Sequence, residues 1–352
     1  MRLFRPTLEH STEFNSMHDF INNSIGDLHT AFLFGIIAIT LLALGKGADL
    51  LVEEAVALST RLGISKVLIG ATIVSLGTTL PEVTVSVMAA IGGNPDLALG
   101  NAVGSVICDT GLILGIATLI GKIPLNRTLL NRQGYIQLGV GFLLVVACLP
   151  FANLGSVFTE GGSLPQVVGF GFLVLLGGYL WISTRWAKSG EGASLEVESH
   201  EKAALPMILF KIFCGLALII LSSEVLIPTV EETALRFDVP QSIIAATLVA
   251  FGTSLPELVT AVTAVRKGHG ELAIGNVIGA DILNVLFVAG MAAAVTPSGL
   301  QASPNFFTTL FPAMIVLLLV LRASIVFSKD NLSKIGGAAL LLGYIGYLVI
   351  SL

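Results

Sequence analysis

Two short segments of the sequence combine glycine, hydroxyl residues, proline and a carboxylate within otherwise apolar stretches. They read GTTLPE at 77–82 and GTSLPE at 252–257. Pro81 and Pro256 each remove a backbone donor and clash with the carbonyl group four residues back, so each predicts a break in a helix. At membrane depth, interrupted backbone is tolerated only where protein buries it or where it lines a cavity.

An all-oxygen cation site is the chemistry that these segments favour. Glu82 and Glu257 are ionisable residues in apolar surroundings, where a functional role is the default hypothesis. The other expected donors are the hydroxyl groups of Thr78, Thr79, Thr253 and Ser254 and the carbonyl groups that the breaks would free at Ser75 and Ala250. Calcium takes about six to eight oxygen ligands, and no soft ligand is present for copper or thiolate zinc. The alternative for each segment is a proline kink whose glutamate is hydrogen-bonded for packing, but two copies of the motif favour ions.

The stretch that follows each motif adds polar residues at matched positions. The first copy has Asn101, Gly104, Ser105 and Asp109, and the second has Asn276, Gly279, Ala280 and Asn284. Ser105 and Asp109 are an i,i+4 pair and point to one face of a helix. The glycines belong to GxxxG pairs, which let helices approach closely. For the two asparagines, hydrogen bonds between helices are favoured over direct ligation.

Asp281 breaks this correspondence, because it aligns with Val106. It stands three residues before Asn284, on roughly the same side of a helix. Two interpretations stay open: a carboxylate of the ion site, or a buried acid that hydrogen bonds satisfy.

A second acidic pair, Asp49 and Glu224, lies toward the middle of two long apolar stretches. Lys46 precedes Asp49 by three residues, which favours a salt bridge within one helix over a role in an ion pathway.

The composition places the chain in the membrane. Of its 352 residues, 54% are hydrophobic and 12% are charged, and the mean hydropathy is +0.91. Soluble globular chains carry about 25% charged residues. Spans of about 20 apolar residues are expected at about 31–59, 67–91, 97–121, 134–151, 166–187, 205–234, 241–265, 272–295, 306–327 and 333–351. The expected fold is an all-α polytopic membrane protein with ten transmembrane helices.

An internal repeat relates the two halves at an offset of 175 positions. Residues 69–82 match 244–257, and residues 97–107 match 272–282. Five spans per copy is an odd number, so the second copy enters the bilayer inverted, with the broken helices at the core and the site at the interface of the repeats. The expected parts are a tail (1–30), a first repeat (31–187, motif about 67–121), a connector (188–204) and a second repeat (205–352, motif about 241–296).

The distribution of basic residues predicts the orientation. Most of the 18 lysines and arginines fall in connectors on one face, which should be cytoplasmic. Both termini are then extracytoplasmic, the central connector is cytoplasmic, and the protein lies in the inner cell membrane.

Several other classes of function find no support in the sequence. The net charge of −5 gives no basic face for nucleic acid, and Cys108, Cys148 and Cys214 lie in apolar runs as packing residues. No nucleophile–base or metal-protease motif suggests an enzyme, and no prosthetic group or obligate protein partner is expected.

The doubled pattern GTSLPE followed by GNxxGS resembles the alpha repeats of the calcium/cation antiporter superfamily, and most closely its prokaryotic sodium/calcium exchanger branch. The resemblance covers nearly the whole chain from about residue 31. It implies ten spans and alternating access, with calcium and several sodium ions competing for one central cluster.

Carried over by position, the resemblance makes Glu82 and Glu257 the acidic calcium ligands. Further oxygens for calcium or sodium would come from Thr78, Thr253, Thr79, Ser254, Ser105 and the carbonyl groups of Ser75 and Ala250. This chain departs from the family pattern in having Ala280 for a serine, followed by Asp281, and in exchanging the usual asparagine and aspartate to give Asp109 and Asn284.

The expected function is the exchange of calcium for sodium, with these two ions and the bilayer as the only partners. The alternative is a calcium/proton antiporter, in which Asp109 could carry the proton. A channel is disfavoured, because two broken helices differ from the rings of equivalent ligands that are typical of pores.

Overall fold

The computed structural model describes residues 28–188, 204–237 and 252–351. The predicted connector and the predicted seventh span up to residue 251, which includes Ala250, lie largely outside these residues. Within them the regular secondary structure is helical apart from an isolated bridge between Pro124 and Asn331 and one small sheet, in which β1 (Gly162–Leu164) pairs antiparallel with β2 (Leu300–Ala302). The all-α prediction missed this sheet because each strand is only three residues long.

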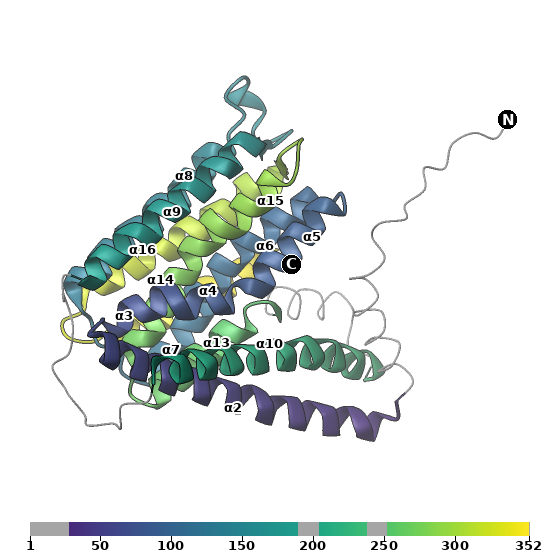
Figure 1. The fold of residues 1–352 in the computed structure, drawn as a ribbon. Coiled ribbons are helices and arrows are strands. Elements are labelled where there is room, and N and C mark those ends of the chain that lie inside the picture. The colour runs from purple at the N-terminus through teal and green to yellow at the C-terminus, as the bar shows by residue number, and fades with distance from the viewer. Residues whose placement is uncertain (1–27, 189–203, 238–251, 352) are drawn as a thin grey trace.

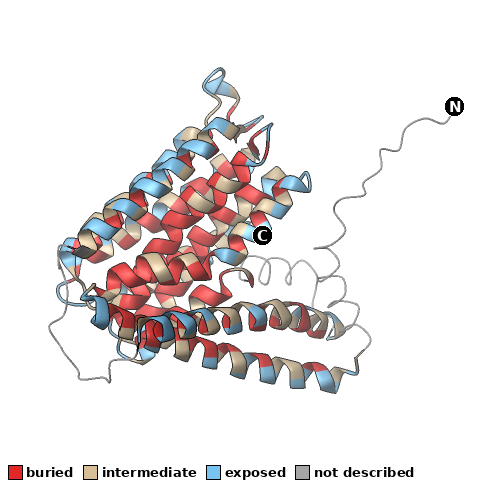
Figure 2. Cartoon of the chain, viewed as in Figure 1, coloured by how far each residue is buried: buried red, intermediate tan, exposed pale blue. Residues whose placement is uncertain are grey.

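Two long helices, α2 (Thr30–Leu62) and α10 (Leu205–Arg236), run side by side along the lower edge of the view in Figure 1. A Cβ atom at Gly47 would lie 3.0 Å from the carbonyl oxygen of Gly215, so these glycines allow close contact of the two backbones. Only 28% of the apolar stretch of either helix is buried. The pair is therefore a peripheral layer, as the exposed and intermediate colours along it in Figure 2 show.

The centre of the molecule is built from interrupted helices. The first series comprises α3 (Lys66–Ile69), η1 (Gly70–Val74), α4 (Ser75–Thr78) and α5 (Leu80–Ile91); the next comprises α6 (Pro95–Ile107), η2 (Cys108–Ile113) and α7 (Leu114–Ile120). In the second half, α13 (Leu255–Arg266) is followed by α14 (Gly270–Leu283), η5 (Asn284–Ala289) and α15 (Gly290–Ala294). Buried shares of 72% in Pro95–Ile120 and 89% in Gly270–Ala294 make these two spans the core.

The remaining helices pack around this core. They are α8 (Arg127–Ala147), α9 (Gln166–Lys188), η6 (Phe306–Leu310), α16 (Phe311–Phe327) and α17 (Lys334–Ser351), with one short 3₁₀ turn, η3 (Leu154–Ser156). The largest difference from the predicted boundaries is at α8, which begins at 127 rather than 134. Asn126 caps this helix by accepting a hydrogen bond from the Leu129 N–H group at 3.4 Å.

Seven helices among the described residues are long and apolar enough to cross a membrane, or eight if the bent pair Lys66–Thr78 and Leu80–Ile91 is one span. The α8 helix is not among them, because polar residues such as Arg132, Gln133 and Gln137 interrupt its apolar character. The protein is a multi-pass helical membrane protein, and the count of ten remains a prediction.

Contacts between connectors agree with the expected alternation of faces. At one end, Leu125 donates a backbone hydrogen bond to the carbonyl group of Asp330 at 2.8 Å. At the other end, the backbone of Ser303 donates to Asp96 at 3.2 Å. Each of these contacts joins segments predicted for the same face of the membrane.

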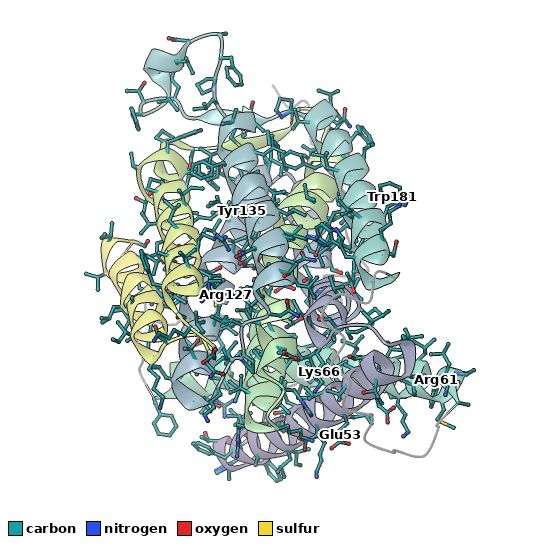
Figure 3. All side chains as sticks on the ribbon, turned by 90° about the vertical axis from the view of Figure 1, so that its left-hand side faces the viewer. Glu53, Arg61, Lys66, Arg127, Tyr135 and Trp181 are labelled. Carbon is teal, nitrogen blue, oxygen red and sulfur yellow. The ribbon has the colours of Figure 1, made fainter. Side chains whose placement is uncertain are left out.

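Basic and aromatic side chains meet at the end of the molecule that faces the viewer in Figure 3, where Arg61, Lys66 and Arg127 are labelled. The Arg322 guanidinium lies 4.1 Å from the ring centre of Tyr135, and that of Arg185 lies 3.9 Å from the ring centre of Trp181. Such pairs suit a membrane–water interface, where aromatic rings and cationic groups are both accommodated.

Candidate cation site

The first predicted break is a bend of 44° at Thr79, between α4 and α5. Thr79 has φ −82° and ψ −1°, so the backbone bends without unwinding. Its N–H group still donates to the carbonyl of Ser75 at 2.9 Å. The prediction that the break frees the Ser75 carbonyl is therefore wrong: Pro81 lacks an N–H group, and the carbonyl that loses its donor is that of Gly77, four residues earlier.

The second motif has matching geometry where it is described. Ser254 has φ −84° and ψ 9°, and Pro256 lies in the first turn of α13. Proline suits this position because the first N–H groups of a helix have no partner within the helix. The two motifs thus place Glu82 and Glu257 in the first turns of α5 and α13.

Both glutamates are buried at the centre of the protein, each only 1% exposed. The hydroxyl group of Thr79 donates to Oε1 of Glu257 at 3.5 Å. In the reciprocal direction, the hydroxyl groups of Thr253 and Ser254 lie near the Glu82 carboxylate, although neither donates a hydrogen bond to it. Each carboxylate therefore faces the hydroxyl pair of the other motif.

Several oxygen atoms at this centre lack a hydrogen-bond partner within the described chain. They are Oε1 and Oε2 of Glu82, Oε2 of Glu257, Oγ of Ser254, Oδ1 of Asp109 and Oδ1 of Asn284. A buried polar atom without a partner costs about 1–3 kcal/mol, and more when it is charged. A bound cation offsets this cost.

Two asparagines bridge the motifs in a symmetric way. The Thr253 hydroxyl donates to Oδ1 of Asn101 at 3.3 Å, and the Thr78 hydroxyl donates to Oδ1 of Asn276 at 3.5 Å. Both members of the second bond are shifted by 175 positions from those of the first. Asn101 also donates to the Glu82 carbonyl at 3.3 Å and to Ser86 at 3.0 Å, which makes it the more firmly held asparagine.

Two turns of π-helix, η2 and η5, carry Asp109 and Asn284. The amide of Asn284 donates to Oδ2 of Asp109 at 3.3 Å. A π turn adds a residue to the helical turn and is frequent at functional sites. Ser105, one turn before Asp109, is 3% exposed and belongs to the same buried region.

Asp281 is 1% exposed, and its oxygen atoms differ in their surroundings. Oδ2 accepts hydrogen bonds from the Thr110 hydroxyl and the Gln137 amide, both at 2.5 Å, whereas Oδ1 has no partner in the described chain. Thr110 and Gln137 were missed by the sequence analysis. Gln133 and Gln137, buried at i,i+4 positions of an apolar span, were the available indication.

The glycines differ in what surrounds them. A Cβ atom at Gly279 would lie 2.5 Å from Cα of Ala71, and one at Gly275 would lie 2.3 Å from the carbonyl oxygen of Val67, so α14 contacts α3 and η1 backbone to backbone. No described atom lies within 4 Å of a Cβ atom at Gly104. The repeat equivalent of Ala71 is residue 246, which lies outside the described chain.

The predicted salt bridge between Lys46 and Asp49 is wrong. Asp49 pairs with Lys267 at 3.0 Å, and Lys267 also pairs with Glu53 at 2.6 Å. Asp49 and Glu53 lie one turn apart on α2 and can both reach a lysine beyond the end of α13. The contact thus joins the peripheral pair to the core.

A cavity of about 180 Å³ lies between α10 and the two motifs. Glu224 and Ser223 of α10 line one side, and Pro81, Thr253 and Pro256 line the other. Glu224 therefore faces the region of the site, as an ion-pathway role requires.

Within the described residues, no group of three or more histidine, cysteine, aspartate or glutamate side chains could by itself hold a metal ion. A cation at this centre therefore needs hydroxyl, amide or carbonyl oxygens in addition to carboxylates. This donor chemistry suits sodium and calcium better than transition metals.

Comparisons with known proteins agree with this chemistry. The family model described as "Sodium/calcium exchanger protein" matches residues 32–185 and 207–352. The sodium/calcium exchanger MaX1 of Methanosarcina acetivorans is 29% identical over 344 residues, which cover 90% of this chain and 97% of the relative. The inner membrane protein YrbG of Escherichia coli is 34% identical over 82% of this chain and 89% of its own length. A structure of the sodium-calcium exchanger NCX_Mj has a TM-score of 0.75 at 25% identity, covering 91% of this chain and 99% of the other.

Proposed function

Because the chain belongs to the sodium/calcium exchanger protein family, we propose that it exchanges calcium for sodium across the membrane at the cluster around Glu82 and Glu257. The family is one of cation exchangers, so the chain is a membrane transporter and not an enzyme. The substrate pair and the residues that bind it belong to the proposal.

One observation carries the proposal: two buried glutamates face each other's hydroxyl pairs and have oxygen atoms without partners. Ionised carboxylates at membrane depth are costly unless they are paired. No basic side chain forms an ion pair with either glutamate in the described structure, so a cation is the partner that the arrangement requires.

The roles of the residues follow from their positions. Glu82 and Glu257 are the acidic ligands of calcium, and Asp109 and Asn284 add oxygens beside them. The hydroxyl groups of Thr78, Thr79, Thr253, Ser254 and Ser105 complete the sodium and calcium sites. Ala280 supplies no hydroxyl group where the family pattern has a serine.

Calcium and sodium exclude each other because they share the same carboxylates. With the cluster loaded, its charge is neutralised and the site can pass from one face to the other. With the cluster empty, two or three carboxylates repel each other in a medium of low dielectric constant, which penalises the transition. This difference in free energy couples the two ion flows.

The peripheral pair of α2 and α10 is the moving part in this proposal. Its low burial contrasts with that of the core spans, and the Glu224 cavity lies where α10 meets the two motifs. Sliding of α2 and α10 opens that cavity to one face at a time, within a topology of ten spans in two inverted repeats and a cytoplasmic central connector.

The test is calcium uptake into vesicles that contain the purified chain, with sodium, potassium or protons as the sole counter-ion. We expect uptake only with an outward sodium gradient. Glu82→Gln and Glu257→Gln should abolish it, whereas Glu160→Gln, at an exposed position, should not. Uptake driven by a pH gradient without sodium would instead identify a calcium/proton antiporter, and normal uptake in both glutamine variants would refute the site.

A further inference from the structure

Asp281 is a buried carboxylate that the exchange cycle proposed above does not use. It lies on α14 and contacts η2 through Thr110 and α8 through Gln137. The α8 helix belongs to neither motif, so this contact reaches beyond the segments that define the cluster.

The contact is specific to one half of the molecule. The residue 175 positions before Asp281 is Val106, which is 1% exposed and apolar. The residue 175 positions after Gln137 is Pro312, which carries no amide. Both partners therefore depart from the repeat together, and the departure adds one carboxylate to the core.

Two hydrogen bonds favour the ionised form of Asp281, against the cost of burying its charge. Two donors converge on Oδ2 at 2.5 Å each, and hydrogen bonds donated to a carboxylate stabilise its ionised form. No ion pair to Asp281 exists within the described chain. The second oxygen, Oδ1, is buried and has no partner. The ionised form is retained only if a positive charge is supplied from outside the protein, beside the unpartnered Oδ1.

Asp109 is close by. Thr110 follows it directly on η2 and donates its hydroxyl hydrogen to Asp281. The Oδ1 atoms of Asp109 and Asn284 also have no partner. Three oxygen atoms without partners thus belong to neighbouring turns of η2, α14 and η5.

We propose that Asp281 binds a sodium ion through Oδ1, at a side site that Thr110 and Gln137 position. This inference rests on the proposed exchange function and adds to it a monovalent ion that is not held by the glutamates. We assign a monovalent ion because one added carboxyl group can balance one positive charge, and because the hydrogen bonds to Oδ2 leave a single oxygen of Asp281 for coordination. Sodium, like calcium, is a hard cation and takes oxygen donors of this kind.

The test is equilibrium binding of radioactive sodium to the purified full-length chain in lipid nanodiscs, without calcium. We expect Asp281→Asn to bind one equivalent of sodium less than the unchanged chain. Gln137→Leu, which keeps the carboxylate and removes one donor, should weaken sodium binding at the same site by about tenfold, the low end of the effect of losing an outer-shell partner. Gln133→Leu is the matched control, because Gln133 lies one turn away on α8 and accepts its hydrogen bond from Tyr179.

The outcomes separate this inference from the proposed function. In Glu82→Gln/Glu257→Gln, calcium binding should be lost while the Asp281-dependent sodium equivalent remains. If Asp281→Asn is folded and binds as much sodium as the unchanged chain, the side site does not exist. The same conclusion follows if Gln137→Leu and Gln133→Leu behave alike. Release of a proton on sodium addition that disappears in Asp281→Asn, without loss of a sodium equivalent, would show that Asp281 carries a proton and would overturn the sodium assignment.

Discussion

Asn284 donates a hydrogen bond to Asp109 at 3.3 Å, across 175 positions of the chain. The same interval relates the two copies of the repeat in the sequence. Equivalent positions can touch each other only where two copies meet at their local symmetry axis, so these two residues mark that axis. An acid on one side and an amide on the other give the pair one carboxyl group, whichever copy carries the acid.

The contact between Asp109 and Asn284 predicts the effect of exchanging these two residues. Asp109→Asn should lower calcium affinity by about 10- to 100-fold, the range found when a metal site loses a supporting group. The double variant Asp109→Asn/Asn284→Asp restores the charge on the opposite side of the axis and should recover most of the loss. Calcium titration of both variants is the measurement, and a double variant no better than the single one would contradict the symmetric position of the pair.

The two asparagine bridges should differ in strength. Asn276 accepts from Thr78, whereas Asn101 accepts from Thr253 and also donates to Ser86 and the Glu82 carbonyl. Replacement by leucine should therefore destabilise the protein more at Asn101 than at Asn276. With about 1 kcal/mol for each hydrogen bond lost, the difference should be about 1–2 kcal/mol. Thermal unfolding in detergent measures it, and equal costs would show that the extra bonds of Asn101 contribute nothing.

Close backbone contact predicts the effect of a single methyl group. Gly279→Ala places a Cβ atom 2.5 Å from Cα of Ala71 and should destabilise the protein by about 1–3 kcal/mol, the usual cost of overpacking. Gly139→Ala on α8 is the control, since nothing lies within 4 Å of the new atom. Alanine has the higher helix propensity, so this control should be neutral or slightly stabilising. The melting temperatures of the two variants, each compared with that of the unchanged protein, measure these effects on stability.

Lys267 links the peripheral pair to the core through Asp49 and Glu53. All three side chains are partly exposed, so Lys267→Gln should change stability by no more than about 1 kcal/mol. Its effect on the rate of calcium exchange should be larger, because α2 is then free to move relative to α13. Stopped-flow uptake, with Lys122→Gln as the control at an exposed position, measures the rate. An unchanged exchange rate would show that this ion pair does not restrain α2.

The candidate site was only partly accessible to prediction. The two glutamates, the hydroxyl pairs and an interruption of the helix at the first motif follow from the sequence, because proline chemistry and residue spacing are local properties. Gln137 was missed because its contact with Asp281 spans 144 positions and α8 lacks the motif. The expectation that the Ser75 carbonyl is freed was wrong because a proline kink can bend a helix and keep the hydrogen bond before it.

The sequence by itself determined the membrane class, the position of most apolar helices, the internal repeat and the residue types at its centre. These depend on hydropathy, on backbone chemistry and on spacing along the chain. Only the tertiary structure decided that Asp49 forms its ion pair with Lys267 and not with Lys46, and that each glutamate faces the hydroxyl pair of the other motif. It also decided that one oxygen of Asp281 accepts hydrogen bonds while the other has no partner in the described chain. Those facts depend on which distant segments pack together, because the partner of a buried charge is chosen by distance in space.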